Sequence, residues 1–195
     1  MTGVAAPAVP LDVHPLTTDR WGDLEALFGP HGACGGCWCM WWRCARSQFR
    51  AQAGEGNRRA LRALLEAGRV PGLLGYRDGQ PVGWVSVAPR EEYPSLERSR
   101  VLRRLDDLPV WSLVCLFVAS RQRRQGIALA LVRSAVEHVR AQGGRIVEAY
   151  PTVPRRGRLP AVSSYMGVPS LYARLGFVEC ARPSPARKVM RLQVG

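Results

Sequence analysis

Apolar side chains recur along the chain at intervals typical of both helices and strands. Residues 127–141 carry them at steps of three and four, with charged side chains between, which predicts an amphipathic helix. The run 110–118 is apolar almost throughout, as in a strand buried on both faces. Because residues 145–150 predict another strand directly after the helix, the three elements should form a right-handed crossover between parallel strands.

The rest of the chain predicts a mixed sheet with further helices around it. Apolar and β-branched residues on both sides of the turn dipeptide Asp78-Gly79 indicate a β-hairpin over residues 71–89. Residues 31–44, rich in Gly, Cys and Trp, fit neither period and predict an irregular loop. We expect one α/β (α+β) domain over residues 17–195, with a mixed central sheet flanked by about four helices and with residues 1–16 as an N-terminal leader. The other expected elements are helices near 18–28, 57–68 (with Asn57 as its cap) and 169–176, and strands at 177–181 and 189–192.

Composition limits the class of protein. Of the 195 residues, 47% are hydrophobic and 22% are charged, which is enough apolar surface to fold as a soluble globule. The longest mainly apolar run, residues 110–118, has nine residues including Ser112, far short of the roughly 20 that a membrane-spanning helix needs. The N-terminus lacks a basic start and an apolar stretch, so we expect no secretion signal, a cytoplasmic location and reduced cysteines.

Charge narrows the expected partners. The chain has 28 basic and 15 acidic side chains, a formal charge of +13, and Lys188 is its single lysine. This charge favours an anionic partner. The arginines stand in small separate groups that match no recognisable nucleic-acid-binding module, so nucleic acid is not expected as a partner. A membrane is not expected either, because no apolar run is long enough to span one.

The segment 118–128 joins the apolar strand directly to the start of the amphipathic helix. Backbone N–H groups at a helix start have no intrahelical acceptor, and the helix dipole adds positive potential there. Gly126 and Ala128 allow a phosphate to approach the backbone closely, and Arg123 and Arg124 add charge. The segment therefore predicts a diphosphate site; the alternative is that its small residues only help the helix to dock on the sheet.

Two motifs in this part of the chain resemble those of the GNAT superfamily of N-acetyltransferases. The acetyl-CoA loop of that family has Arg or Gln, then Gly three residues later and Gly or Ala two residues after that, which are Arg123, Gly126 and Ala128 here. The second motif is a tyrosine four residues before Gly-Phe, found here as Tyr172 and Gly176-Phe177. The resemblance extends over about residues 73–178 and becomes looser before that stretch.

The resemblance implies an acetyl-CoA-dependent transfer of an acetyl group to a primary amine of a small molecule or a protein, by direct attack of the amine. It implies that the strand before the loop offers backbone groups to the pantetheine arm and the thioester carbonyl, and that Tyr172 gives a proton to the departing thiolate. From spacing alone, Tyr172 would be a core tyrosine. The residues implied to bind acetyl-CoA are Leu116, Phe117, Val118, Arg123, Arg124, Gln125, Gly126, Ile127, Ala128 and Leu129.

The sequence departs from the family at two positions. Tyr165 stands where many members have an asparagine that touches the pantetheine, and Ser112 stands where histone-type members have a carboxylate base. The resemblance therefore supplies no general base. Glu91, Glu92 and Glu148 are weak candidates, because such groups are more often solvated or paired. The missing carboxylate leaves an alternative function open, a non-catalytic acyl-CoA sensor.

Four cysteines within residues 31–44 have three competing interpretations: a metal site, an apolar plug, and a redox-active Cys34–Cys37 pair, which the lack of a flanking thioredoxin-type strand-helix unit disfavours. Cys34 and Cys37 are spaced like metal ligands, and Cys39, Cys44 or His31 could complete a tetrahedral site. The usual distant second pair is missing, so we favour an apolar plug without metal. The resemblance places this segment on the acceptor side, where its aromatic residues and Arg43 should shape a pocket for an amine with an apolar or ring-containing body. The tryptophans that favour such an acceptor are Trp38, Trp41, Trp42 and Trp84.

The sequence is compatible both with a monomer and with a homodimer.

Overall fold

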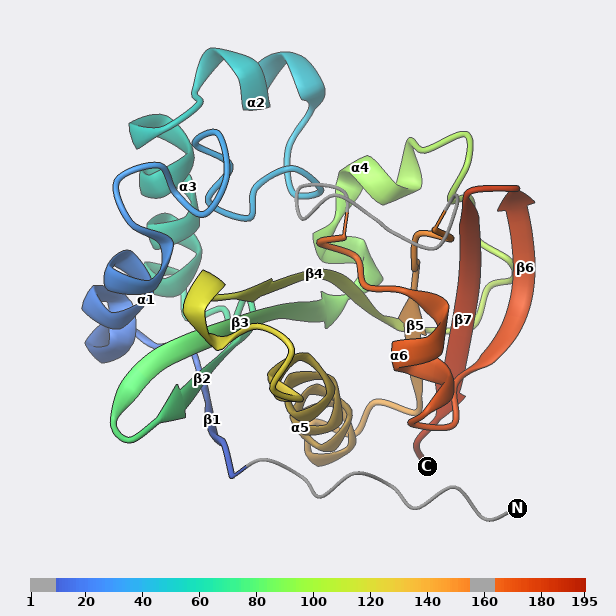
Figure 1. The fold of residues 1–195 in the computed structure, drawn as a ribbon. Coiled ribbons are helices and arrows are strands. Elements are labelled where there is room, and N and C mark those ends of the chain that lie inside the picture. Colours follow the sequence, from blue (N-terminus) through green and yellow to red (C-terminus); the bar gives the residue numbers. More distant parts are fainter. Residues whose placement is uncertain (1–9, 155–163) are drawn as a thin grey trace.

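The computed structural model describes residues 10–154 and 164–195, which form a seven-stranded sheet with helices on both faces (Figure 1). The strand order is β1-β2-β3-β4-β5-β7-β6. Neighbouring strands are antiparallel except β4 and β5, which are parallel. The strands are β1 Asp12–Pro15, β2 Leu73–Arg77, β3 Gln80–Pro89, β4 Trp111–Val118, β5 Ile146–Ala149, β6 Val178–Ser184 and β7 Arg187–Gln193.

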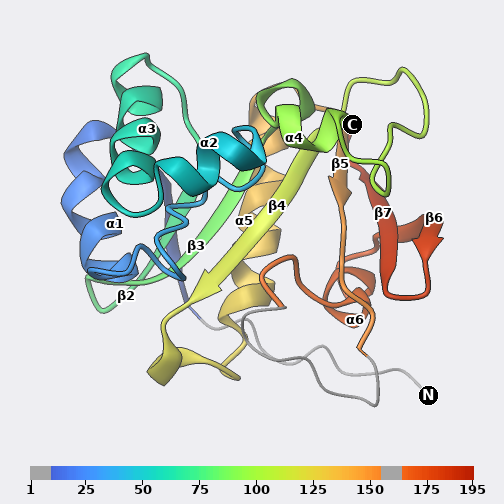
Figure 2. The same ribbon diagram turned by 90° about the horizontal axis from the view of Figure 1, so that it is seen from above.

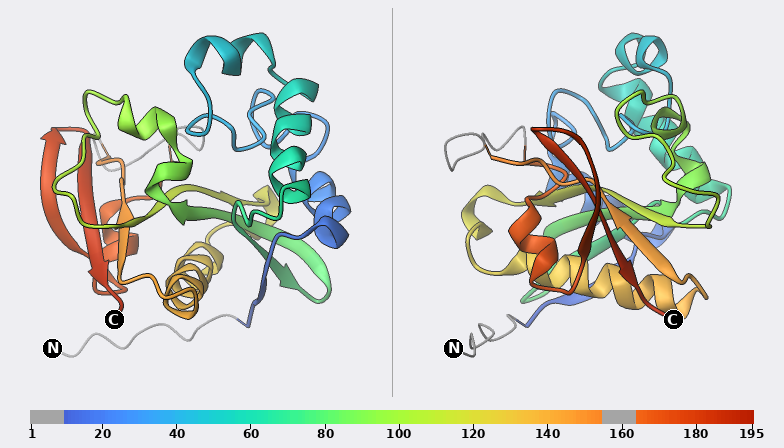
Figure 3. Two further views of the ribbon diagram at one scale, coloured as in Figure 1. Left: turned by 180° about the vertical axis from the view of Figure 1, so that it is seen from behind. Right: turned by 90° about the vertical axis from the view of Figure 1, so that its right-hand side faces the viewer.

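The helices lie in two layers. Helix α5 lies against one face of the sheet, and α1 and α3 cover the other face, as the view from above shows (Figure 2). Strands β1 and β6 are the two edges of the sheet, and they stand at opposite sides of the molecule (Figure 3). The helices are α1 Trp21–Phe28, α2 Arg46–Ala51, α3 Glu55–Glu66, α4 Pro94–Glu97, α5 Ile127–Ala141 and α6 Pro169–Ala173.

The alternation of strand side chains separates two apolar cores. On β2, Leu73 packs into the core under α5, whereas its neighbour Leu74 packs into the core with α1 and α3. Strand β3 behaves likewise, with Val85 on the α5 side and Trp84 on the other. Both faces of the central strands are therefore buried, as the apolar run 110–118 predicts.

Strands β4 and β5 diverge soon after they pair. Their ladder joins Trp111–Leu113 to Val147–Ala149, and β4 then continues for five more residues to Val118. On its other side β4 stays paired with β3, with a bulge opposite Ser86 and Val87. The far half of β4 thus has one edge that β5 does not cover, and this edge opens onto the candidate site.

The elements with the clearest patterns are confirmed by the structure. The turn of the β2–β3 hairpin has positive φ at Asp78 (51°) and Gly79 (73°), as a two-residue type I′ turn requires. Helix α5 begins at Ile127 and buries the apolar side predicted for it. The mixed α/β fold is confirmed, with six helices around one mixed sheet in the described part of the chain.

Three details differ from the expectations. Asn57 lies inside α3, where its buried amide donates to the Gly36 carbonyl (2.9 Å) and ties α3 to the cysteine-rich segment, so it is not a cap. Residues 12–15, predicted as part of a leader, pair with β2 as strand β1, and residues 1–9 of that leader lie outside the described residues. The short helices α2 and α4 carry too few residues to show a period.

Candidate active site

A cavity of about 930 Å³ lies where β4 separates from β5. Its walls come from four parts of the chain: the end of β4, the turn into α5, the segment 164–174 and the cysteine-rich segment with α2. The size is within the range of small-molecule and cofactor sites. The cavity joins the predicted diphosphate site to the predicted acceptor side.

The turn into α5 has the backbone shape of an anion site. Arg124 (φ 62°) and Gly126 (φ 82°) both adopt the left-handed conformation, and Gly126 is the N-cap of the helix. Helix geometry leaves the amides of Gly126, Ile127 and Ala128 without intrahelical acceptors. A conformation of this kind turns successive N–H groups toward one point, where an anion can sit. The absence of a side chain at Gly126 keeps that point open.

Side chains hold this turn in place. Arg123 donates through Nε to the Val118 carbonyl (3.1 Å) and so closes the turn on the end of β4. Arg77 on β2 donates to the amide oxygens of Gln122 (2.9 Å) and Gln125 (2.5 Å). The predicted binding residues Arg123 and Gln125 thus act here as braces for the turn.

The predicted set of residues is largely gathered on the cavity wall. The turn contributes Arg123, Arg124, Gly126, Ile127 and Ala128 to this wall, and β4 contributes Leu116, Phe117 and Val118. Leu129 also lines it, but its amide donates to the Gly126 carbonyl (3.0 Å) and is not available to a ligand. Gln125, although in the turn, is not among the residues that line the cavity.

The amide of Leu116 is engaged within the protein. It donates to the carbonyl of Tyr165 at 2.6 Å, so the segment 164–168 lies along the edge of β4 that β5 leaves uncovered. Tyr165 also lines the cavity, and burial raises the pKa of its phenol to about 12. The backbone group predicted for the pantetheine or the thioester carbonyl therefore already has a partner.

Tyr172 is fully buried on α6, just behind the cavity wall. Its hydroxyl donates to the Met166 carbonyl (3.0 Å), and its ring lies against Gly167, where any Cβ would collide with it. Burial raises the pKa of the phenol well above its usual value, so it stays protonated at neutral pH. The neighbouring residues Gly167 and Leu171 line the cavity, whereas Tyr172 is not among the lining residues. Tyr172 thus lies one layer behind the wall, in the apolar core under α5, with its hydroxyl bonded to Met166.

The cysteine-rich segment contributes aromatic surface to the cavity, but from fewer residues than expected. Trp41, Trp42 and Phe49 line the cavity. Trp38 is buried and stacks on Trp21 (ring centroids 6.0 Å apart), so it belongs to the apolar plug. The expectation that Trp38, Trp84 and Arg43 shape this pocket was wrong. Buried Trp84 and buried Arg43, which pairs with Glu92 (2.9 Å), are not among the lining residues.

The cysteines do not form a metal centre in the part of the chain that the structure describes. No three His, Cys, Asp or Glu residues within it lie close enough to hold a metal ion. All six cysteines lie in this part, and each is a free thiol. Cys39 and Cys44 are buried in the plug, whereas Cys34 is exposed.

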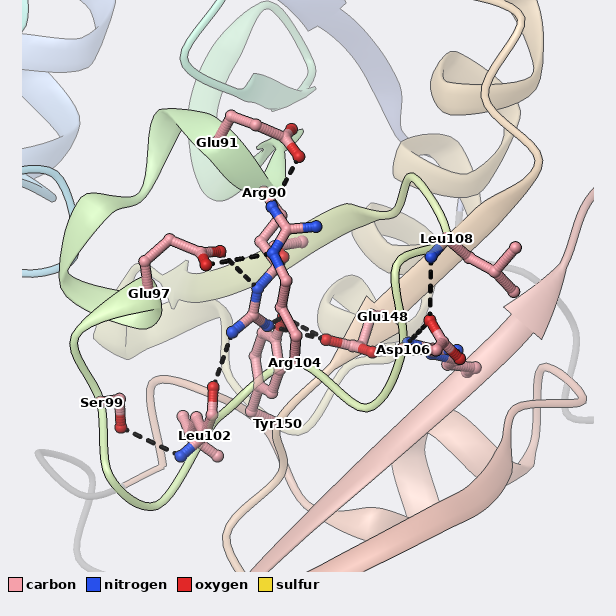
Figure 4. A network of polar contacts seen from close by, with 12 residues as sticks. Arg90, Glu91, Glu97, Ser99, Leu102, Arg104, Asp106, Leu108, Glu148 and Tyr150 are labelled. Atoms are coloured by element: carbon pink, nitrogen blue, oxygen red, sulfur yellow. Dashed lines mark hydrogen bonds and ion pairs between the residues drawn. The ribbon is translucent and has the colours of Figure 1, made fainter.

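Glu148 lies in a buried ion-pair network away from the cavity (Figure 4). Only 1% of its side chain is exposed. One carboxylate oxygen accepts from Arg90 (2.9 Å) and the Tyr150 hydroxyl (2.6 Å), and the other accepts from Arg191 (2.7 Å). With both oxygens taken and no contact with the cavity, Glu148 has the surroundings of a structural group. The Tyr150 hydroxyl also forms a hydrogen bond (2.7 Å) with the hydroxyl of Ser112, the residue at the family's carboxylate position.

The other two weak candidates for a base are also paired. Glu91 accepts from Arg104 (2.7 Å), and this ion pair lowers its pKa. Glu92 accepts from Arg43 (2.9 Å). Neither is among the residues that line the cavity. The described wall of the cavity has no carboxylate and no histidine, so a base must be sought among its other residues.

Sequence reasoning missed several residues of the site. Arg77 lies 45 residues before its partner Gln122, and no local pattern indicates such a contact. Gly167 has a positive φ (73°) and faces Tyr172, a signal that its sequence neighbours do not reveal. Arg174 lies within the second motif and lines the cavity, although the spacing of that motif gives no sign that its charge faces a ligand.

Comparison with known proteins matches this geometry. The model of the acetyltransferase (GNAT) family matches residues 38–167, more than half of the chain. The chain therefore belongs to the acetyltransferase (GNAT) family, and it is an acyltransferase whose co-substrate is acetyl-CoA. A comparison with curated proteins found no match.

Solved structures show the same fold at low sequence identity. An N-acetyltransferase from Staphylococcus aureus superposes with a TM-score of 0.56 and 10% identity, covering 96% of this chain and 100% of the other. PaiA N-acetyltransferase from Thermoplasma acidophilum, solved with coenzyme A, gives 0.54 and 12%, covering 95% and 99%. A GNAT-family acetyltransferase from Streptococcus pneumoniae gives 0.54 and 14%, covering 95% and 100%. At these identities the likeness establishes the fold. Within the described residues, no helix is long and apolar enough to cross a membrane.

Proposed function

We propose that the protein transfers the acetyl group of acetyl-CoA to a primary amine on a small molecule or peptide with an apolar or ring-containing body. The observation that carries this proposal is the cavity that joins the turn into α5 to the aromatic wall of Trp41, Trp42 and Phe49. Acetyl-CoA fits the turn because its diphosphate is an anion and the turn offers free amides, a glycine N-cap and nearby arginines. An aromatic body on the acceptor would find matching surface at the other end.

In this proposal the backbone of residues 124–128 binds the diphosphate, and the arginines Arg124 and Arg174 add charge at the cavity rim. The amine attacks the thioester carbon beside β4, whose backbone polarises the carbonyl. Tyr172 supplies the proton to the departing thiolate. A phenol is protonated at neutral pH, as an acid must be before the step, and burial raises the pKa of Tyr172 further. It must exchange its bond with the Met166 carbonyl for one toward the cavity.

Release of free thiol from acetyl-CoA, measured over a panel of primary amines, tests the proposal. The panel needs arylalkylamines, alkylamines, polyamines and peptides with free N-termini. We expect transfer to arylalkylamines and poor transfer to polyamines, because the chain carries a charge of +13 that repels polycations. Tight acetyl-CoA binding with no transfer to any amine would support the non-catalytic sensor instead, which membership of an enzyme family does not favour.

Replacing Tyr172 by phenylalanine should lower kcat while leaving acetyl-CoA affinity nearly unchanged. The expected loss is about 10- to 100-fold, at or below the low end of general acid catalysis, because a thiolate is already a fair leaving group. Steady-state kinetics and an equilibrium titration with acetyl-CoA measure the two effects. An unchanged kcat in a folded variant would remove the acid role from Tyr172.

Binding of acetyl-CoA should release the segment 164–168 from β4. The pantetheine arm has to reach the edge of β4 where Tyr165 now accepts from the Leu116 amide. We expect amide hydrogen exchange to become faster within residues 164–168 and to stay slow at Leu116, which gains a new acceptor. Exchange that is the same with and without acetyl-CoA would mean that the pantetheine binds elsewhere.

A further inference from the structure

Cys39 occupies an unusual place on the acceptor side of the cavity. It lines the cavity, yet only 6% of its surface is exposed, and its backbone has a positive φ of 58°. The indole N–H of Trp84 on β3 donates to its sulfur at 3.3 Å. The strained backbone and the tryptophan donor together fix the sulfur over the middle of the sheet.

A second thiol stands beside Cys39. Cys115, on β4, lines the cavity together with Cys39, and the two thiols interact electrostatically. Cys115 directly precedes Leu116, the residue whose backbone the family resemblance assigns to the pantetheine or thioester. The sulfur of Cys39 is therefore next to the strand position where the acetyl group is expected to lie.

The groups around Cys39 favour its thiolate. The neighbouring thiol of Cys115 has the largest effect; together with the hydrogen bond from Trp84 and the charge of Arg43 it outweighs burial, which acts in the opposite direction, and lowers the pKa of Cys39 to about 7. The pKa of Cys115 is raised by its interaction with Cys39 and by burial. Of the two thiols, Cys39 is therefore the one that loses its proton first.

Other titratable groups near Cys39 do not compete with it as a base. Cys37 and Tyr165 interact with it electrostatically and line the cavity, and burial raises the pKa of both. Tyr93 lies deeper, and burial raises its pKa to about 12. Within the described wall, which has no carboxylate and no histidine, Cys39 is the group whose pKa is lowered toward neutrality.

We propose that Cys39 is the general base of the acetyl transfer, taking its position on the acceptor side from Trp84 and Cys115. This inference rests on the proposed function. As the amine nitrogen forms its bond to the acetyl carbon, the N–H proton passes to the sulfur of Cys39. The bond between that carbon and the sulfur of coenzyme A breaks, and the thiolate leaves with a proton from Tyr172. Cys39 then gives its proton to solvent through the cavity and Tyr172 regains one from solvent, which restores both groups for the next turnover.

A base with these properties accounts for the missing carboxylate at Ser112. General base catalysis is most effective when the pKa lies near the working pH, which a cysteine reaches only when its thiolate is stabilised. The carboxylates of Glu91, Glu92 and Glu148 are each paired with arginine outside the cavity. The sulfur of Cys39 faces the cavity and accepts a hydrogen bond from Trp84.

Three matched variants test the proposal: Cys39→Ala, Cys115→Ala and, as control, Cys180→Ala, whose thiol is exposed on β6. The first readout needs no acceptor. The rate of carbamidomethylation at Cys39, followed by peptide mass spectrometry against pH, should have a midpoint near 7 in the wild type. Cys115→Ala should move this midpoint upward, and Cys180→Ala should leave it in place. A wild-type midpoint at the ordinary cysteine value of about 8.5 would overturn the proposal.

The second readout is the pH profile of coenzyme A release from acetyl-CoA, with 2-phenylethylamine and with water as acceptors. We expect Cys39→Ala to lower kcat about 100-fold, with little change in acetyl-CoA affinity, and to abolish the rise near pH 7. Cys115→Ala should shift that rise to higher pH, and Cys180→Ala should match the wild type. Full activity in folded Cys39→Ala would overturn the base role alone.

Two other outcomes would contradict the base role of Cys39 in different ways. An acetyl group found on Cys39 by intact mass, and removed by hydroxylamine, would make Cys39 a nucleophile and contradict the base role. A wild type that releases no coenzyme A with water or with any amine of the panel would contradict the proposed function, and the base role with it.

Discussion

Gly126→Val should weaken acetyl-CoA binding by at least about 100-fold. Gly126 has a φ of 82°, a conformation that a β-branched residue adopts only with strain, so the turn into α5 would have to change shape. Each hydrogen bond from an amide to a charged phosphate contributes about 1.5–3 kcal/mol. The loss of two such bonds therefore costs about 3–6 kcal/mol, which is a factor of more than 100 in Kd.

The matched control lies at the other end of the same helix. Gly143 follows α5 and has a φ of 76°, and a Cβ at this position would have no neighbouring atom within 4 Å. Gly143→Val should carry a similar backbone strain but bind acetyl-CoA like the wild type. Calorimetric titration of both variants measures the difference. Equal affinities would show that the turn at Gly126 does not hold the diphosphate.

Glu148→Gln should lower the free energy of unfolding by about 3–5 kcal/mol, the usual cost of breaking a buried ion pair. The carboxylate is 1% exposed and pairs with Arg90 and Arg191, two arginines that are themselves nearly or largely buried. Removing the negative charge leaves both guanidinium groups with less compensation in a poorly hydrated place. Chemical denaturation followed by circular dichroism measures the change.

Glu66→Gln is the control for this effect. Glu66 forms an ion pair with Arg62 on the exposed surface of α3, where water screens the interaction. The free energy of unfolding of this variant should therefore stay close to that of the wild type. If Glu148→Gln instead lowered kcat with unchanged stability, Glu148 would belong to the catalytic machinery and the base role of Cys39 would lose its support.

Local patterns predicted the parts of the fold that depend on local periods. The hairpin turn at Asp78-Gly79, the buried strand 110–118 and the helix from Ile127 all follow from spacing within one segment. Strand β1 was missed because its four residues lie in a proline-rich stretch and gain their structure only by pairing with β2. Asn57 was misjudged because a good capping residue can also bond to a distant loop.

The candidate site shows the same division. Gly126 and Tyr172 stand out in the sequence because each belongs to a motif with fixed spacing. The partners that give Cys39 its character come from β3 and β4, with Trp84 45 residues away along the chain. The network of Glu148 spans 58 residues to Arg90 and 43 to Arg191. Such contacts arise from the sheet topology, which the sequence alone predicts only in outline.

A crystal structure of the protein with coenzyme A tests the central claim most directly. We expect the diphosphate within about 2.7–3.2 Å of backbone amides in residues 124–128, and the sulfur in the cavity between Cys115 and Tyr172. Electron density for the diphosphate at another surface, or a sulfur outside this cavity, would contradict the assignment of this cavity to acetyl-CoA.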